Sequence, residues 1–275
     1  MLNLISIVGL APHPPIIIPE IGRGEIKKVS KTVEGMKVLS SRIRDASPDL
    51  LIIITPHGQI MREGPAILDM DELIGDFGQF GYSGIQLKMR TDRELIELIK
   101  EESMPGGPKP VLISDKDYLL RSGKVLDHGA MVPLYYLQQE GLDLPGLHVT
   151  IGFQPLNELY RFGSNLAGVL EKRGGRAAVV ASGDLSHRLI PGAPAGFNER
   201  GAEFDRTIVN LLQESRVEDI LNLDQDLIEQ AGECGLRPFA IALGMLEGEK
   251  INSDIISYEG PFGVGYLVAS INATV

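Results

Sequence analysis

The chain has 275 residues, with 43% hydrophobic residues, 23% charged residues and a formal net charge of −11 at pH 7. This length can build a large buried core, and the composition is that of an ordinary globular protein. The negative charge argues against nucleic acid or an anionic membrane as a partner, because both attract clustered Lys and Arg side chains and the sequence has no such cluster.

The cysteine content and the apolar segments indicate a compartment. The single cysteine, Cys234, excludes an internal disulfide and fits a reducing environment. The apolar N-terminus lacks a basic segment and is broken by Pro12, Pro14 and Pro15, so it predicts a strand and not a signal peptide. The longest apolar runs, such as 50–54, are too short to span a bilayer. We therefore expect a cytoplasmic protein that does not enter the membrane.

In the first half of the chain, apolar periodicity alternates between strand-like and helix-like segments. The helix-like segment at 91–102 begins at a potential cap, Thr91. The pattern predicts strands at 4–10, 50–55, 65–70, 84–89 and 110–113, and helices at 25–46 and 91–102.

The second half continues the alternation. The helix predicted at 155–173 would end at the pair Gly174-Gly175. The pattern predicts strands at 147–152, 177–182 and 263–273, and helices at 130–140, 155–173, 198–214 and 236–247. Alternating strands and helices favour an α/β fold with a mostly parallel or mixed central sheet, covered by helices on both faces. Because no repeat or linker divides the chain, we expect one domain over residues 1–275.

Three of the five histidines follow strongly apolar strands. They are His13 in "APHPP", His57 in "TPHG" and His187 in "SGDLSH". Parallel strands would bring all three to one sheet edge, where ligands of α/β proteins bind outside the carboxyl ends of the strands. A single loop histidine is usually structural, but this repeated position favours a site, with His128 of the D-H-G turn as a fourth member. We expect His148, which begins a strand, to be structural.

No standard local motif explains these histidines. The sequence lacks H-E-x-x-H, C-x-x-C and the phosphate-binding loop, and Ser182 in A-S-G-D does not match the nucleophile elbow. The glycines of 260–267 precede a strand and do not open a helix, which argues against a dinucleotide site.

The histidines favour a metal ion as the species that this site binds. Imidazole commonly binds Fe, Zn and Cu, and two histidines with one carboxylate form the facial triad of non-haem Fe(II) oxygenases. Glu233, in the glycine-flanked turn "GECG", is the candidate carboxylate. Asp184, three residues before His187, is a rival as a ligand or as a residue behind the ligands.

Five motifs in this order resemble the class III extradiol ring-cleavage dioxygenases, the LigB family: A-P-H-P-P, T-P-H-G, D-H-G-x-x-V-P-L, S-G-D-L-S-H and A-G-E-C-G-L. Within that superfamily the chain is most similar to the bacterial and archaeal Memo-like branch. The resemblance implies a mononuclear Fe(II) site at the strand ends with His13, His57 and Glu233 as ligands. It also implies His187 as the acid–base catalyst and His128 as a residue of the substrate pocket.

The activity implied by the resemblance is cleavage of a small catechol or aminophenol by O₂, with Zn possible in place of Fe(II) in purified protein. Phe80, Tyr82 and Phe262 are the rings available to contact such a substrate. In the Memo-like branch a cysteine occupies the region of the third ligand, and ring cleavage is not expected of every member. The alternative is therefore a Memo-like metal-binding protein with a redox role or a ligand- or partner-binding role.

Adjacent side chains of an extended segment point to opposite faces, so only one of Glu233 and Cys234 should face the metal. We expect Glu233 to do so, because Fe(II) in oxygenases favours a carboxylate, and Cys234 to pack as a small buried side chain. A homodimer is the expected oligomeric state.

Overall fold

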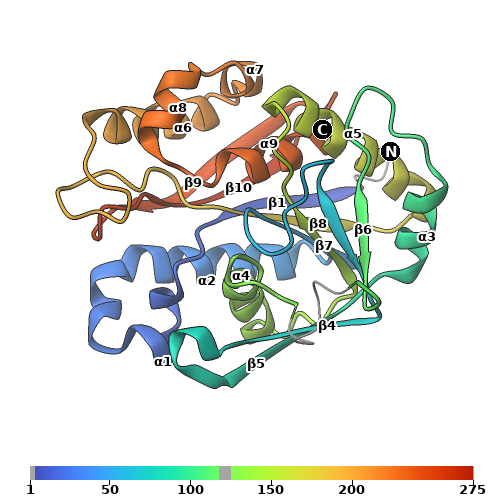
Figure 1. The fold of residues 1–275 in the computed structure, drawn as a ribbon, viewed down its shortest axis with the longest axis horizontal. Coiled ribbons are helices and arrows are strands. Elements are labelled where there is room, and N and C mark those ends of the chain that lie inside the picture. Colours follow the sequence, from blue (N-terminus) through green and yellow to red (C-terminus); the bar gives the residue numbers. More distant parts are fainter. Residues whose placement is uncertain (1–3, 118–124, 275) are drawn as a thin grey trace.

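The computed structural model of the chain describes residues 4–117 and 125–274. Its centre is a sheet of eight strands in the order β6-β3-β7-β2-β8-β1-β10-β9, with helices on both faces (Figure 1). The strands are β1 (Ile5–Ala11), β2 (Leu50–Thr55), β3 (Ala66–Asp69), β6 (Val111–Ser114), β7 (Gly146–Thr150), β8 (Ala177–Ser182), β9 (Ile251–Glu259) and β10 (Tyr266–Ala273).

Strand direction makes the sheet mixed. The inner strands β7, β2, β8 and β1 run parallel to one another. The flanking pairs β3–β7, β1–β10 and β10–β9 are antiparallel, and β6 pairs parallel to β3. The predicted α/β class, with a large sheet covered on both faces, is confirmed.

Helices divide into two layers, which Figure 1 shows on opposite sides of the sheet. One layer holds α2 (Ser30–Asp45) and α4 (His128–Gln139). The other holds α3 (Arg93–Glu101), α5 (Leu156–Arg173), α6 (Glu199–Gln213), α7 (Val217–Leu221), α8 (Gln225–Ala231) and α9 (Leu236–Gly244). Short turns of helix are η1 (Pro15–Ile17), α1 (Pro19–Gly22), η2 (Arg23–Val29) and η3 (Gly78–Phe80). No helix in the described part of the chain is long and apolar enough to cross a membrane.

The central strands are buried on both faces, which explains their continuous apolar sequences. Every residue of β2 is buried. Its side chains alternate between the two cores, so that Ile52 packs with α5 and α9 whereas Ile53 packs with α2 and α4. The β2 sequence therefore lacks the polar alternation of a half-exposed strand.

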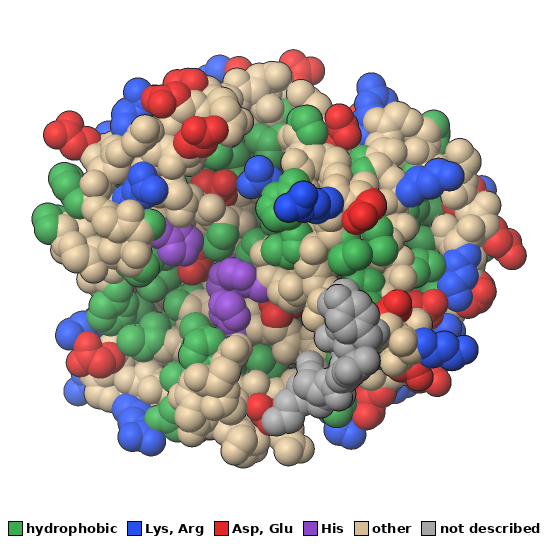
Figure 2. Space-filling model, in the orientation of Figure 1, with side chains coloured by type: hydrophobic (Ala, Val, Ile, Leu, Met, Phe, Trp, Pro, Cys, Tyr) green, Lys and Arg blue, Asp and Glu red, His purple; other side chains and the backbone are tan. Residues whose placement is uncertain are grey.

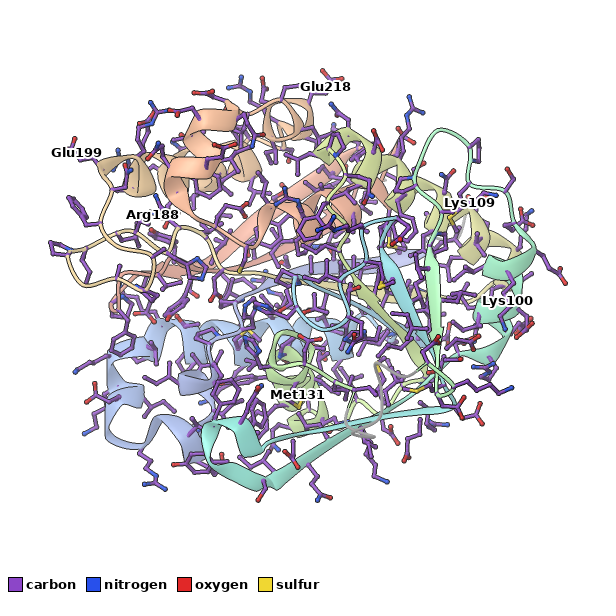
Figure 3. All side chains as sticks on the ribbon, in the orientation of Figure 1. Lys100, Lys109, Met131, Arg188, Glu199 and Glu218 are labelled. Carbon is purple, nitrogen blue, oxygen red and sulfur yellow. The ribbon has the colours of Figure 1, made fainter. Side chains whose placement is uncertain are left out.

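A two-stranded hairpin stands beside the main sheet. It pairs β4 (Glu72–Phe77) with β5 (Tyr82–Arg90), and η3 forms its tip. Met131 of α4 points toward this hairpin and packs against Gly75 of β4 (Figure 3). The tip lies close to the first turn of α4, because the ring centroid of Phe80 is 5.5 Å from that of His128.

The sequence pattern missed several elements. Neither β4 nor β9 was predicted, because β4 pairs only with β5 and β9 is an edge strand in which exposed and partly buried residues mix. The short helices α7 and α8 were also missed. Helix α3 is capped not by Thr91, as predicted, but by Asp92, whose carboxylate accepts a hydrogen bond of 2.9 Å from the Leu95 N–H.

Helices α5 and α9 pack backbone against backbone. A Cβ atom on Gly163 of α5 would lie 1.9 Å from the carbonyl oxygen of Ile241 in α9. A Cβ on Gly244 of α9 would lie equally close, 1.9 Å, to the carbonyl oxygen of Tyr160. This contact fixes α9, whose first turn adjoins the segment that carries Cys234.

Replacing Gly163 by alanine should therefore destabilise the fold by about 1–3 kcal/mol, because the added methyl group forces the two helices apart. Gly168 of the same helix is exposed, and a Cβ atom added to it would have nothing within 4 Å. As the matched control, Gly168→Ala should stabilise by about 0.5–1 kcal/mol through helix propensity. Urea unfolding of both variants measures the difference, and equal stabilities would contradict the close packing.

Candidate metal centre

Three adjacent parallel strands deliver three histidines to one edge of the sheet. His13 follows β1, His57 follows β2 and His187 follows β8, and these strands lie in the order β2-β8-β1. His128 is the first residue of α4, which begins two residues earlier than the sequence predicted. Figure 2 shows histidine side chains near the centre of one face, with hydrophobic side chains beside them.

The rings of His13, His57 and His128 touch one another. Their centroids are 4.8 Å apart for His13–His57, 5.3 Å for His13–His128 and 4.3 Å for the stacked pair His57–His128. The Nε2 atoms of His13 and His57 are 3.0 Å apart. Two nitrogens that bind one metal at ~2.0–2.1 Å lie at about this separation, so the pair has the spacing of two ligands.

Cys234 joins this histidine pair. Its Sγ lies 3.7 Å from His13 Nε2. Among the described residues, His13, His57 and Cys234 bring three potential ligand atoms within 4.8 Å of one another. Metal–sulfur and metal–nitrogen bonds of ~2.3 and ~2.0–2.1 Å are compatible with this spacing.

Glu233 points the other way. Its Oε2 accepts a hydrogen bond of 2.6 Å from the Leu236 N–H at the start of α9. The side chain lines a separate hollow of about 280 Å³ together with Phe153 and Arg237. The orientation that we expected for this pair is therefore reversed: the carboxylate turns to the helix and the thiol turns to the histidines.

Ser182 determines which nitrogen of His13 carries the proton. Its hydroxyl donates its single hydrogen to the carbonyl oxygen of Gly129 at 2.5 Å. The 3.0 Å contact between Ser182 Oγ and His13 Nδ1 must then be donated by an Nδ1–H group. His13 Nε2 consequently presents a lone pair to His57 and Cys234. In metal sites, a hydrogen bond from the ring nitrogen that does not bind the metal orients the histidine.

Asp184 supports both His13 and Cys234 by backbone contacts. Its Oδ1 accepts the His13 N–H at 3.0 Å. Its carbonyl oxygen accepts the N–H groups of Cys234 at 3.2 Å and Gly235 at 2.9 Å. Asp184 Oδ2 lies 3.9 Å from His13 Nε2. Asp184 thus lies behind the three gathered ligand atoms.

Burial keeps His13 and His128 neutral. Burial first, and then the neighbouring His57, lower the pKa of His13 to about 3. Burial and the same neighbours lower the pKa of His128 to about 4. Burial, helped by Asp184, raises the pKa of the Cys234 thiol well above its ordinary value. A metal ligand must be a free imidazole or a thiolate, so the histidines are ready to bind and the cysteine would release a proton on binding.

The loop that carries His187 is tied to Ala231, the last residue of α8. The His187 N–H donates to the carbonyl oxygen of Ala231 at 3.2 Å, and the Ser186 hydroxyl donates to the same oxygen at 2.9 Å. A charged His187 lowers the pKa values of His13 and Asp184. Its Nδ1 atom is buried and has no hydrogen-bond partner among the described residues.

Two further residues escaped the sequence interpretation. His148, which we expected to be merely structural, contacts the carboxylate of Asp127 through Nε2 at 2.8 Å. The same carboxylate accepts the Thr55 hydroxyl at 2.7 Å, and Thr55 Oγ1 accepts the His57 N–H at 3.2 Å. Burial alone would raise the pKa of Asp127, but His148 and Thr55 hold it well below its ordinary range. An ionisable residue within the apolar β7 was the available signal.

Of the three candidate rings, Phe80 is nearest to the histidines. Its centroid lies 5.5 Å from that of His128, at the tip of the β4–β5 hairpin. Tyr82 lies beneath the guanidinium of Arg23 at 5.2 Å, and Phe262 lies 5.9 Å from the ammonium of Lys28. Of these three described rings, Phe80 is therefore the one that contacts a histidine of the site.

Comparison with known proteins identifies a family that matches most of the chain. Residues 8–269 match the family described as the catalytic LigB subunit of aromatic ring-opening dioxygenase. Protein CA_C1420 of Clostridium acetobutylicum is 39% identical over 266 residues, which cover 96% of this chain and 57% of that protein. The chain thus spans little more than half the length of this relative.

More distant relatives have named activities. The 3,4-dihydroxyphenylacetate 2,3-dioxygenase of Escherichia coli is 24% identical, with 82% of this chain and 83% of that protein covered. The 2-aminophenol 1,6-dioxygenase beta subunit of a Pseudomonas species is also 24% identical, with coverage of 96% and 92%. The crystal structure of the uncharacterized protein JW3007 from Escherichia coli K12 has a TM-score of 0.60 at 16% identity and covers 97% of this chain and 99% of that one. That likeness concerns the fold alone.

A buried carboxyl, that of Asp205, is bonded to the loop that carries His187 and should make the stability of the fold depend on pH. Asp205 of α6 accepts the Ser186 N–H at 2.8 Å and the Tyr258 hydroxyl at 2.6 Å. Burial nevertheless raises its pKa from 3.8 to about 7. Between these values the folded protein keeps Asp205 protonated while the unfolded chain ionises it. Its contribution to stability is complete below pH ~4 and is lost as the pH rises to ~7.

Asp205→Asn removes this ionisation. The unmodified protein loses stability as Asp205 ionises, and the variant does not. The difference in the free energy of unfolding, variant minus unmodified protein, should therefore increase by up to about 4 kcal/mol between pH 4 and pH 8. Urea unfolding over this pH range measures the difference, with the exposed Asp226→Asn as a control. A difference that does not change with pH would contradict the raised pKa.

Proposed function

The chain belongs to the LigB family of aromatic ring-opening dioxygenases, and on that premise we propose that it is an Fe(II)-dependent extradiol dioxygenase that cleaves a small catechol or 2-aminophenol. The observation that carries the proposal is the His13–His57 pair, with its Nε2 atoms 3.0 Å apart at the ends of parallel strands. The named activities of the two distant dioxygenase relatives suggest the substrate class.

His13, His57 and Cys234 are the residues that would hold the metal. The lone pair that Ser182 directs onto His13 Nε2, and the nearby Sγ atom, fit a divalent transition metal. When bound, Fe(II) would supply a Lewis acid and a template on which the diol and O₂ meet. Glu233 is not proposed as a ligand, because its carboxylate accepts the Leu236 N–H.

The remaining side chains would bind and deprotonate the substrate. His187 is the proposed acid–base residue, because its Nδ1 atom is unpartnered among the described residues and histidine is the side chain that most often transfers protons in enzymes. His128, neutral and stacked on His57, would line the pocket and contact the substrate hydroxyl groups. Phe80 would form an apolar wall beside it.

A second function is favoured by Cys234. A thiolate is softer than the carboxylate of the facial triad and suits Zn or Cu(I) as well as iron. A Memo-like metal-binding protein with a redox role or a ligand- or partner-binding role, and without ring cleavage, is therefore the alternative. The observation behind it is the 3.7 Å contact between Cys234 Sγ and His13 Nε2.

Anaerobic loading with Fe(II), followed by air and a panel of catechol, 3,4-dihydroxyphenylacetate and 2-aminophenol, separates the two functions. The dioxygenase should consume one O₂ per ring opened, with both oxygen atoms in the product, and generate a product that absorbs visible light. Iron-loaded protein that takes up no O₂ with any of these compounds would favour the alternative.

Alanine variants should divide the histidines by role. His57→Ala should lose bound metal, because it removes a ligand. His187→Ala should retain metal but lose ~10²–10⁴-fold in turnover, the usual worth of a proton-transfer residue. Metal analysis of the purified variants, together with O₂ uptake, measures both. Equal metal loss in the two variants would instead make His187 a ligand.

A further inference from the structure

The segment between α8 and α9 presents two adjacent side chains to two different places. Helix α8 ends at Gly232, whose backbone is left-handed (φ 62°, ψ 41°), and α9 begins at Leu236. Cys234 turns toward His13, whereas Glu233 turns toward the hollow lined by Arg237. The turn is therefore the piece of backbone that sets where the thiol lies.

On the site side, besides the contact of Cys234 Sγ with His13, the turn is held by Asp184 and its neighbour Gly183. The Asp184 carbonyl accepts the N–H groups of Cys234 and Gly235, and the Asp184 N–H lies 3.3 Å from Cys234 Sγ. A Cβ on Gly183 would lie 2.2 Å from the Cα of Gly235, so the two turns meet backbone to backbone. These contacts hold the turn from the side of the site.

Glu233 holds the turn from the other side. The cap residue of α9, Gly235, has no side chain with which to satisfy the free N–H groups of the first helical turn. The Glu233 carboxylate replaces that cap by accepting the Leu236 N–H at 2.6 Å. Because α9 is itself fixed against α5, this bond connects the turn to a rigid body.

We infer that Glu233 is a positioning residue: its carboxylate, as the N-terminal cap of α9, holds the 232–235 turn in the conformation that directs Cys234 Sγ at His13. This inference rests on the proposed metal site. It assigns to Glu233 a role that differs from ligation, because the cap requires only a hydrogen-bond acceptor whereas ligation by this residue requires a charged carboxylate.

Replacement by glutamine separates these roles. The amide oxygen of Glu233→Gln can still accept the Leu236 N–H, so this variant should bind Co(II) within about threefold of the unmodified protein. Glu233→Ala removes the acceptor and should weaken Co(II) binding by about tenfold, the lower end of the effect of residues that orient ligands. Both variants should keep a thiolate-to-cobalt charge-transfer band, whereas Cys234→Ser should lose it.

The affinities are measured by competition of Co(II) with a chelator, with absorbance as the spectroscopic readout and thermal unfolding as the check on folding. Glu229→Ala on α8 is the matched control, because this glutamate is exposed and bonds only to Gln225 among the contacts described. If Glu233→Ala does not fold, Glu233→Met, which fills the space of the side chain but offers no oxygen to the Leu236 N–H, takes its place in the comparison with Glu233→Gln.

Three outcomes would overturn the inference. Co(II) affinity of Glu233→Ala equal to that of the unmodified protein would show that the cap does not position the thiol. Loss in Glu233→Gln as large as in Glu233→Ala would show that the charge itself binds metal. Absence of the charge-transfer band in the unmodified protein would remove both this inference and the proposed ligands. Protein that shows the band but cleaves no catechol would contradict only the proposed dioxygenase activity.

Discussion

The close contact between the turn after β8 and the turn before α9 is the constraint on which the site depends. Gly183 and Gly235 meet there without side chains, and one carbonyl oxygen, that of Asp184, accepts two N–H groups of the opposite turn. β8 lies between β1 and β2, so the same turn adjoins the segments that carry His13 and His57. The contact thus joins the C-terminal helical layer to the centre of the parallel sheet.

The charge states of the side chains in the site follow from how deeply each is buried and from the hydrogen bonds that it receives. His13 and His128 are kept neutral by burial, whereas Asp127 stays ionised because His148 and Thr55 donate to it. Burial raises the pKa of Asp184 to about 6. Free imidazole nitrogens and a nearby negative charge suit a cation, and His13, His128 and Asp127 supply both.

The third donor is the chemical feature that distinguishes this chain from a facial triad. Among the described residues, the potential ligand atom that lies with His13 and His57 is the Cys234 thiol and not a carboxylate, while the neighbouring Glu233 caps α9. A thiolate donates more electron density than a carboxylate and binds soft metals more strongly. Metal preference and reactivity are therefore expected to depend on which of the two adjacent residues, Glu233 or Cys234, faces the histidines.

Much of the fold and part of the site could be predicted from the sequence, because those features are local. Continuous apolar runs identified β1, β2 and β8, and the residues that follow them had to lie at one edge once the strands were parallel. Edge strand β9 and hairpin strand β4 escaped, because their partly exposed sequences carry little periodicity.

Only the tertiary structure decided between Glu233 and Cys234. Alternation along the chain shows that they face opposite sides, but which side holds the histidines depends on where α9 packs, and α9 is placed by its glycine contact with α5. The roles of Ser182, Asp127 and His148 were hidden for the same reason: each acts through a partner more than twenty residues away in the chain. The sequence by itself determined which residues reach the sheet edge, whereas long-range packing determined which atoms face one another there.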